Sequence, residues 1–161
     1  MYSLRKAVPS DTDAMAYVHA TSWQETYTGL LEDHIISKFN IENRKGMWAA
    51  FLQKNIDSQR AYVAVHSDKV VGIASWNETT DHVELLTLYV LSEFQRQGIG
   101  SSLFKQVEKD ADEKGKRLIT WVLKENKAAF FYKKMGLKLI KSEEKTLGNT
   151  SIQELMFATR L

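Results

Sequence analysis

Residues 83–101 read VELLTLYVLSEFQRQGIGS, a stretch that joins an apolar run to a glycine-containing loop. The run from Val83 to Leu91 is apolar enough to predict a strand in the middle of a sheet. After Gly98, apolar residues recur at helical spacing, and they predict a buried stripe made of Ile99, Leu103, Phe104, Val107 and Ala111. A strand, a glycine loop and a helix in this order indicate a domain that mixes strands and helices.

The loop from Gln95 to Ser101 has the composition of a phosphate-binding turn. Glycines at 98 and 100 let the backbone approach a ligand without an intervening Cβ, and the helix start directs free N–H groups and a partial positive charge toward an anion. The loop is not a Walker A loop, because no Gly-Lys-Ser/Thr follows, and the Gly-x-Gly-x-x-Gly fingerprint fails at Leu103. The loop therefore predicts a pyrophosphate site, although its glycines could also serve only a tight turn.

The segments on either side of this stretch have alternating strand and helix patterns. The expected strands are short β-branched or aromatic runs and span residues 2–8, 61–66, 70–76, 83–91, 117–123, 137–145 and 152–159. The expected helices have apolar residues every three or four positions and span residues 13–31, 32–54, 99–114 and 127–135. We expect Gly29 and Gly46 to interrupt the first two, and Gly115 and Gly136 to end the last two. The predicted order is β, α, α, β, β, β, α, β, α, β, β.

The composition excludes several classes of protein. A chain of 161 residues, 43% of them hydrophobic, predicts one domain over residues 1–161. A formal net charge of +2 is too small for nucleic-acid binding through bulk charge. The absence of cysteine excludes a disulfide framework, a cysteine-ligated metal and a thiol nucleophile. The four histidines are too far apart for a typical zinc site, so we predict no metal.

The N-terminal segment lacks the pattern of a secretory signal. Arg5 and Lys6 are not followed by an apolar stretch of about 7–15 residues. No run in the chain approaches the ~18 apolar residues of a membrane-spanning helix. We therefore expect a cytoplasmic protein with no membrane partner.

Two motifs together resemble the signatures of a known family. Gln95-x-x-Gly98-x-Gly100, after a strand that ends Leu-Tyr-Val, resembles motif A of the GNAT superfamily of acetyl-CoA-dependent N-acetyltransferases. Asn126, followed by AFFYKKMGL at 129–137, resembles the second signature of that family at about the right spacing. The resemblance covers essentially the whole chain. It implies a GNAT-like α/β (α+β) fold, with a mixed, mostly antiparallel central sheet of about seven strands flanked by about four helices.

The resemblance also implies how acetyl-CoA, or coenzyme A, would bind as cosubstrate. The pyrophosphate would lie on the backbone amides of the glycine loop, which belong to Arg96, Gln97, Gly98, Ile99, Gly100 and Ser101. The pantetheine would add to the strand edge as a peptide does, along the main chain of Leu88, Tyr89 and Val90. Asn126 and Lys134 are further expected contacts, although Asn126 also has the pattern of a helix cap and the lysines around 134 that of a solvated face.

Acetyl transfer to an amine needs a base and a group that stabilises the leaving thiolate. A lysine-like amine with a pKa near 10.4 is protonated at neutral pH. Glu84 stands where some family members carry a glutamate base, and Tyr27 or a water is the alternative base. The resemblance sets Tyr132 beside the thioester sulfur as a hydrogen-bond donor. Core packing is the alternative role for Tyr132, and a solvent-facing ion pair is the alternative for Glu84.

Trp23 and Tyr27 are the expected contacts of the acceptor amine. They stand at i and i+4, and Trp-x-x-x-Tyr-x-Gly recurs in small-molecule acetyltransferases of the family, including relatives of polyamine acetyltransferases. Core packing is the alternative role for Trp23. Residues 66–93 carry five acidic groups against Lys69, which suits a cationic acceptor.

These expectations combine into one function. We expect acetyl transfer from acetyl-CoA to a primary amine of a small molecule, such as a polyamine or another amino compound, by direct attack in a ternary complex. The alternatives are a protein N-terminus or lysine as acceptor, and a CoA-binding regulatory module without catalysis. The expected partner is thus a small-molecule or peptide amine and no nucleic acid. Dimers are common in the family, so a homodimer is an expectation of the resemblance, although the sequence does not determine the oligomeric state.

Overall fold

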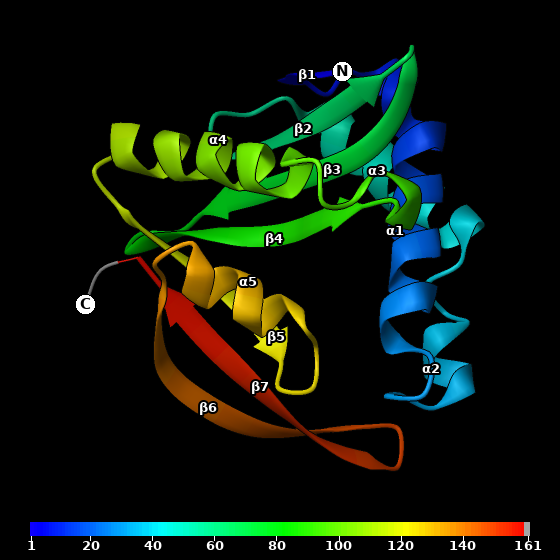
Figure 1. The fold of residues 1–161 in the computed structure, drawn as a ribbon, viewed down its shortest axis with the longest axis vertical. Helices are drawn as coiled ribbons and strands as arrows, with labels where there is room; N and C mark the ends of the chain where they lie inside the picture. The colour runs from blue at the N-terminus through cyan, green and yellow to red at the C-terminus, as the bar shows by residue number, and fades with distance from the viewer. Residues whose placement is uncertain (160–161) are drawn as a thin grey trace.

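The computed structural model describes residues 1–159, which form one seven-stranded sheet with helices on both faces (Figure 1). The strands are β1 (Tyr2–Lys6), β2 (Gln59–His66), β3 (Lys69–Glu78), β4 (His82–Val90), β5 (Arg117–Leu123), β6 (Lys138–Leu147) and β7 (Thr150–Ala158). The helices are α1 (Thr12–Tyr27), α2 (Asp33–Ile36), α3 (Ile41–Lys54), α4 (Ile99–Glu113) and α5 (Ala128–Lys134). Short 3-10 turns span Pro9–Asp11 and Ser92–Phe94.

The sheet has the order β1-β2-β3-β4-β5-β7-β6, so β4 is its central strand, as predicted. Within the described residues, β4 and β5 run parallel and every other neighbouring pair runs antiparallel. The predicted mixed, mostly antiparallel sheet is therefore confirmed. The final hairpin adds its second strand, β7, beside β5, and β6 becomes the edge strand.

The helical region before β2 differs from the prediction. Gly29 has a φ of +87° and follows the end of α1, so the predicted interruption there is confirmed. The interruption predicted at Gly46 is wrong, because Gly46 lies inside α3 at a position where an added Cβ would touch nothing. The second break instead falls before Asn40, whose side chain accepts the N–H of Asn43 at 2.9 Å and caps α3. This extra break gives five helices in place of about four.

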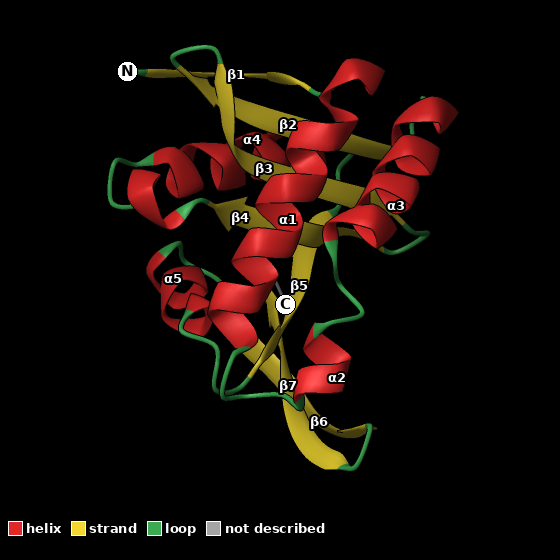
Figure 2. Cartoon of the chain, turned by 90° about the vertical axis from the view of Figure 1, so that its right-hand side faces the viewer, coloured by secondary structure: helices red, strands yellow, loops and turns green. Residues whose placement is uncertain are grey.

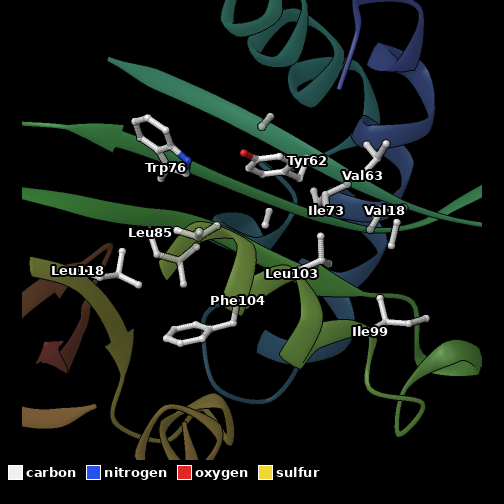
Figure 3. Packing of buried hydrophobic residues seen from close by; sticks show 14 of the residues in the cluster. Val18, Tyr62, Val63, Ile73, Trp76, Leu85, Ile99, Leu103, Phe104 and Leu118 are labelled. Atoms are coloured by element: carbon white, nitrogen blue, oxygen red, sulfur yellow. The ribbon is translucent and has the colours of Figure 1, made fainter. Parts of the chain in front are cut away.

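Helices cover both faces of the sheet. Helices α1 and α3 lie over one face (Figure 2), and α4 and α5 lie over the other (Figure 1). The predicted stripe of α4 is confirmed, since all five of its residues are at most 1% exposed. Figure 3 shows Leu103 of this stripe beneath Ile73 of β3, and Phe104 on the side of Leu85 of β4 and Leu118 of β5. The core thus fixes α4 against the strands from which the glycine loop emerges.

The central strands separate halfway along their length. Within residues 1–159, β4 pairs with β5 over four positions, from His82 opposite Arg117 to Leu85 opposite Thr120. Beyond this point β4 stays paired with β3 as far as Val90, while β5 pairs with β7. The register with β3 shifts opposite Leu86, and such a bulge bends a strand. Figure 1 shows β4 and β5 diverging. The second half of β4 therefore has a backbone edge that faces away from β3 and has no strand beside it.

Candidate active site

The unpaired edge of β4 is the first component of the site. It includes Leu88, Tyr89 and Val90, which are the residues predicted to receive the pantetheine. Backbone N–H and C=O groups on such an edge can pair with an extended ligand as they would with another strand. The separation of β4 from β5 thus provides a docking edge for an elongated molecule.

The glycine loop lies at the end of this edge and is held on both sides. The side chain of Gln95 donates to the carbonyl oxygen of Val90 at 2.9 Å, which ties the loop to the end of β4. The hydroxyl of Tyr2 donates to the carbonyl oxygen of Gly98 at 3.1 Å and hydrogen-bonds Ser102 Oγ at 2.7 Å. These contacts hold the start of α4 in a defined position.

The start of α4 carries backbone donors without acceptors in the helix. The N–H of Ser102 donates to the carbonyl oxygen of Gly98 at 3.0 Å and is the first donor of the helical ladder. The N–H groups of Ile99, Gly100 and Ser101 precede it, so they have no acceptor within the helix. Together with the helix dipole they form a site suited to a phosphate group.

The turn itself requires a glycine at only one of the two glycine positions of the loop. Gly98 has a φ of +84°, a conformation that disfavours any side chain. Gly100 has no such constraint, and an added Cβ would lie at ordinary distances of 3.9 Å from Val90 Cγ2 and 4.0 Å from Phe131 Cε1. The turn therefore accounts for Gly98 but not for Gly100. A Cβ at Gly100 would project between β4 and α5, beside the unpaired edge of β4.

The predicted polar contacts around the loop lie on its surface. Arg96 and Gln97 are exposed on the loop, and Lys134 is exposed at the end of α5. Residues 124–145 carry seven lysines against three glutamates, but these lysines do not all face the loop, because Lys145 pairs with Glu154 at 2.7 Å on the β6–β7 hairpin.

Tyr132 of α5 is buried close to Thr120, the residue of β5 at which its pairing with β4 ends. Its ring packs between Phe104 and Phe157, with centroids 6.2 Å away in each case. Burial raises the pKa of Tyr132 to about 12, while a hydrogen bond with the Thr120 hydroxyl lowers it in part. The phenol therefore keeps its proton at neutral pH and can donate it in a hydrogen bond.

Asn126 joins α5 to α1. Its Oδ1 accepts the N–H of Ala128 at 2.9 Å, which is the predicted capping contact, although the helix begins one residue later than expected. Its Nδ2 donates to the hydroxyl oxygen of Tyr27 at 3.3 Å. Burial raises the pKa of Tyr27, so this phenol also stays protonated at neutral pH and is a poor candidate for the base.

Glu84 lies on β4 close to the point where β5 leaves it. It is half-buried and sits opposite Ile119 of β5, one position before the last pair of the two strands. Burial raises the pKa of Glu84, nearby Glu154 raises it further, and His82 and Lys145 oppose these effects. Among the residues that the structure describes, Glu84 forms no ion pair. The arrangement gives Glu84 more affinity for a proton than an exposed glutamate has.

A cavity of about 260 Å³ lies between α1, α3 and β4. Trp23 lines it and stacks on Phe39 at 3.8 Å between ring centroids, and Tyr27 lies 4.3 Å from Trp23 on the other side. The pair predicted for the acceptor is thus brought together, with Trp23 in the cavity wall and Tyr27 in the adjoining apolar cluster.

Sequence reasoning missed four polar residues of this cavity, which are His19, Arg44, Ser75 and Thr87. His19 is buried, and its Nδ1 accepts the indole N–H of Trp48 at 3.2 Å. Burial, together with the charge of Arg44, lowers the pKa of His19 to about 4, so its ring is neutral at neutral pH. The sequence held a partial indication of His19, because this residue precedes Trp23 by four positions and so lies on the same face of α1. Arg44 has no comparable signal.

The acidic segment 66–93 does not form one surface beside the cavity. Glu78 accepts from Lys114 at 2.8 Å and from Lys116 at 2.6 Å, which neutralises it. Asp68 lines a separate cavity with Arg5. These two of the five acidic side chains therefore do not supply an acidic environment at the cavity, and the cationic acceptor stays a prediction.

Residues 1–159 lack the features of two other classes of site. No group of three or more histidine, aspartate or glutamate side chains in this range could hold a metal ion. No helix in it is long and apolar enough to cross a membrane.

The sequence profile of the acetyltransferase (GNAT) family matches residues 23–137, well over half of the chain. The chain belongs to the GNAT family of acetyltransferases. The matched range begins at Trp23 and includes the glycine loop and the segment from Asn126 to Leu137. Both motifs on which the resemblance depended therefore lie inside the GNAT match.

Two curated GNAT relatives span nearly the same length. The uncharacterized N-acetyltransferase YuaI of Bacillus subtilis is 24% identical over 162 residues, which cover 96% of this chain and 91% of YuaI. The spermidine N(1)-acetyltransferase of Thermoplasma acidophilum is 25% identical over 156 residues, 94% of each chain.

Solved GNAT structures share the fold. The crystal structure of PaiA N-acetyltransferase from Thermoplasma acidophilum in complex with coenzyme A is 26% identical, with a TM-score of 0.79 over 96% of this chain and 98% of that one. The ribosomal-protein-S18-alanine N-acetyltransferase of Escherichia coli has a TM-score of 0.71 at 15% identity, over 98% and 92%. Since the spermidine N(1)-acetyltransferase and the ribosomal-protein-S18-alanine N-acetyltransferase have, by their names, different acceptors, the acceptor must be argued from the site and not from the fold.

Proposed function

We propose that this GNAT enzyme transfers the acetyl group of acetyl-CoA to the primary amine of a small molecule, with residues 1–161 acting as one domain. The observation that carries the proposal is the unpaired edge of β4, which leads to the free N–H groups at the start of α4. Acetyl-CoA has the matching shape, because its extended pantetheine arm ends in a pyrophosphate. The coenzyme A complex of the PaiA relative supports this assignment.

The proposed cofactor contacts extend from the unpaired edge of β4 to the start of α4. The pantetheine pairs with the main chain of Leu88–Val90, and the pyrophosphate lies on the amides of residues 96–101. The exposed side chains of Arg96 and Lys134 supply positive charge near the phosphates. Asn126, which already holds Tyr27, adds a polar contact on the α5 side.

The proposed reaction is direct attack of a neutral amine on the thioester. The amine nitrogen forms a bond to the carbonyl carbon, the carbon–sulfur bond breaks, and coenzyme A leaves as a thiolate. Glu84 takes the proton of the amine, directly or through a water, and its raised pKa favours that transfer. The products are the acetylated amine and, after the thiolate is protonated, free coenzyme A.

Tyr132 stabilises the thiolate by donating a hydrogen bond. Its pKa of about 12 lies well above the ordinary thiol value near 8.5, so full proton transfer to sulfur would be uphill by about 5 kcal/mol. A hydrogen bond that strengthens as sulfur gains charge avoids this cost. The proton that finally reaches the thiolate therefore comes from solvent or from the amine.

Two features support a small molecule as the acceptor. The cavity lined by Trp23 has a volume of about 260 Å³, just below the ~300–1,000 Å³ range of pockets for drug-sized ligands, which suits a smaller acceptor. The spermidine N(1)-acetyltransferase relative acts, by its name, on a small polyamine. A protein N-terminus or lysine as acceptor is the second candidate.

Calorimetry and a thiol-release assay test the proposal. Titration with acetyl-CoA should show binding, and release of free thiol should depend on an added amine. Absence of acetyl-CoA binding at high concentration would end the proposal. Binding without turnover of any polyamine, amino compound or peptide would instead favour a regulatory module. The cytoplasmic location and the homodimer stay predictions, and gel filtration tests the second.

A further inference from the structure

The cavity between α1, α3 and β4 has one cationic side chain in its lining, that of Arg44. The indole Nε1 of Trp23 and the Nε of Arg44 are both buried, and neither has a hydrogen-bond partner within residues 1–159. His19 accepts the Trp48 N–H at Nδ1, so its own proton lies on Nε2, and its ring also lines the cavity. Because Trp23 Nε1 and Arg44 Nε have almost no accessible surface, they do not face the cavity. The polar group that a ligand would meet there is the partly exposed Arg44 side chain, which suits a ligand that brings oxygen atoms.

The charge of the cavity favours the same kind of ligand. Arg44 lies with its guanidinium carbon 4.6 Å from the centre of the Phe39 ring. Among the described residues it forms no ion pair, and no aspartate or glutamate lines the cavity. One guanidinium charge is therefore left uncompensated between aromatic walls, where a single carboxylate would balance it.

The same lining disfavours a polyamine. An ammonium group in the cavity would meet the charge of Arg44, with no carboxylate in the cavity lining to receive it. Glu78 is also not at hand for a polycation, because it pairs with Lys114 and Lys116.

Tyr89 connects this cavity to the proposed reacting groups. Its ring stacks on His19 with centroids 5.2 Å apart, and its hydroxyl interacts electrostatically with Arg44 and with Tyr132. Tyr89 also belongs to the unpaired edge of β4. A small acceptor held at Arg44 thus extends toward the edge where the thioester is proposed to lie.

We propose that Arg44 binds a carboxylate of the acceptor, so that this enzyme acetylates a small amino acid or a similar carboxylate-bearing amine. This inference rests on the proposed function and names its substrate class. The carboxylate pairs with the guanidinium group of Arg44, and the amine of the same molecule attacks the thioester. Arg44 is a specificity-determining residue in this scheme and takes no part in the bond changes.

Matched amines that differ by one carboxylate test the inference. Lysine and cadaverine, ornithine and putrescine, and phenylalanine and phenethylamine are compared by thiol release, with spermidine and the other common amino acids in the same panel. We expect kcat/KM to be about 10- to 100-fold higher for the carboxylate-bearing member of a productive pair, which is the range for one charge-assisted hydrogen-bonded contact.

Two variants on α3 separate binding of the carboxylate from general effects. Arg44→Gln should remove most of the advantage of the carboxylate-bearing amine by raising its KM, while the affinity for acetyl-CoA stays unchanged. Lys45→Gln is the matched control, because it removes a neighbouring cation that does not line the cavity and is partnered with Glu42 at 3.5 Å. It should keep the wild-type preference.

Three results would overturn the inference. They are equal or better turnover of the carboxylate-free amines, an Arg44→Gln variant with an unchanged preference, and no turnover of any amino acid in the panel. Each of these leaves the proposed function standing as long as acetyl-CoA binds and some amine is acetylated. Loss of acetyl-CoA binding in the wild-type protein would instead contradict the proposed function itself.

Discussion

Gly100 allows a test that separates folding from cofactor binding. In Gly100→Ala the new methyl group would lie 3.9 Å from Val90 Cγ2 and 4.0 Å from Phe131 Cε1, both ordinary contacts. The backbone at this position is not in the left-handed region, in contrast to Gly98. The protein can therefore accommodate the methyl group, whereas a pyrophosphate on the neighbouring amides would be displaced by it.

Gly100→Ala should raise the folding stability and lower the affinity for acetyl-CoA. Alanine is a better helix former than glycine by up to about 1 kcal/mol, which for a chain of this length raises Tm by about 2–4 °C. A hydrogen bond from a backbone N–H to a charged phosphate contributes about 1.5–3 kcal/mol, so loss of one such bond weakens binding by at least about tenfold. Gly100→Ala should thus be as stable as the wild type or more stable, and it should bind acetyl-CoA more weakly.

Differential scanning calorimetry and isothermal titration with acetyl-CoA measure these two quantities. Gly46→Ala is the matched control, because Gly46 also lies in a helix and an added Cβ there meets no atom within 4 Å. It should gain the same stability and keep the wild-type Kd. Unchanged acetyl-CoA affinity in a folded Gly100→Ala variant would refute the assignment of this loop to the pyrophosphate.

Three further predictions concern single side chains. Tyr132→Phe should lower kcat by about 10- to 100-fold with little change in the KM for acetyl-CoA, because the lost hydrogen bond forms to the thiolate; steady-state kinetics with an unchanged kcat would contradict this role. The kcat/KM of the wild type should fall as the pH drops through the raised pKa of Glu84, because the protonated carboxyl no longer accepts a proton, and a pH profile of Glu84→Gln should lack that limb. His19 resists protonation down to about pH 4 when folded but accepts a proton near pH 6.5 when unfolded, so stability should decrease by about 3 kcal/mol as the pH falls between these values. Urea unfolding of His19→Gln should show a correspondingly smaller loss, and an equal loss in both proteins would exclude His19 as its source.

The amino-acid sequence by itself determined the local elements of this protein. Periodicity identified the buried stripe of α4 and the seven strands, and the glycine pattern identified the loop at Gly98, because each signal lies within a few neighbouring residues. It failed at Gly46, since an exposed glycine inside a helix costs too little to break it.

Only the tertiary structure decided which residues of different helices and strands come together. The separation of β4 from β5 depends on pairings between distant strands, and the cavity joins His19 and Trp23 of α1 with Arg44 of α3. Periodicity indicates which side of a helix is buried, but not which side chains meet there. A local charge count likewise could not show that Glu78 is neutralised by two lysines more than thirty residues away. Burial also sets the pKa of Tyr132 and of His19, and burial exists only once the chain has folded.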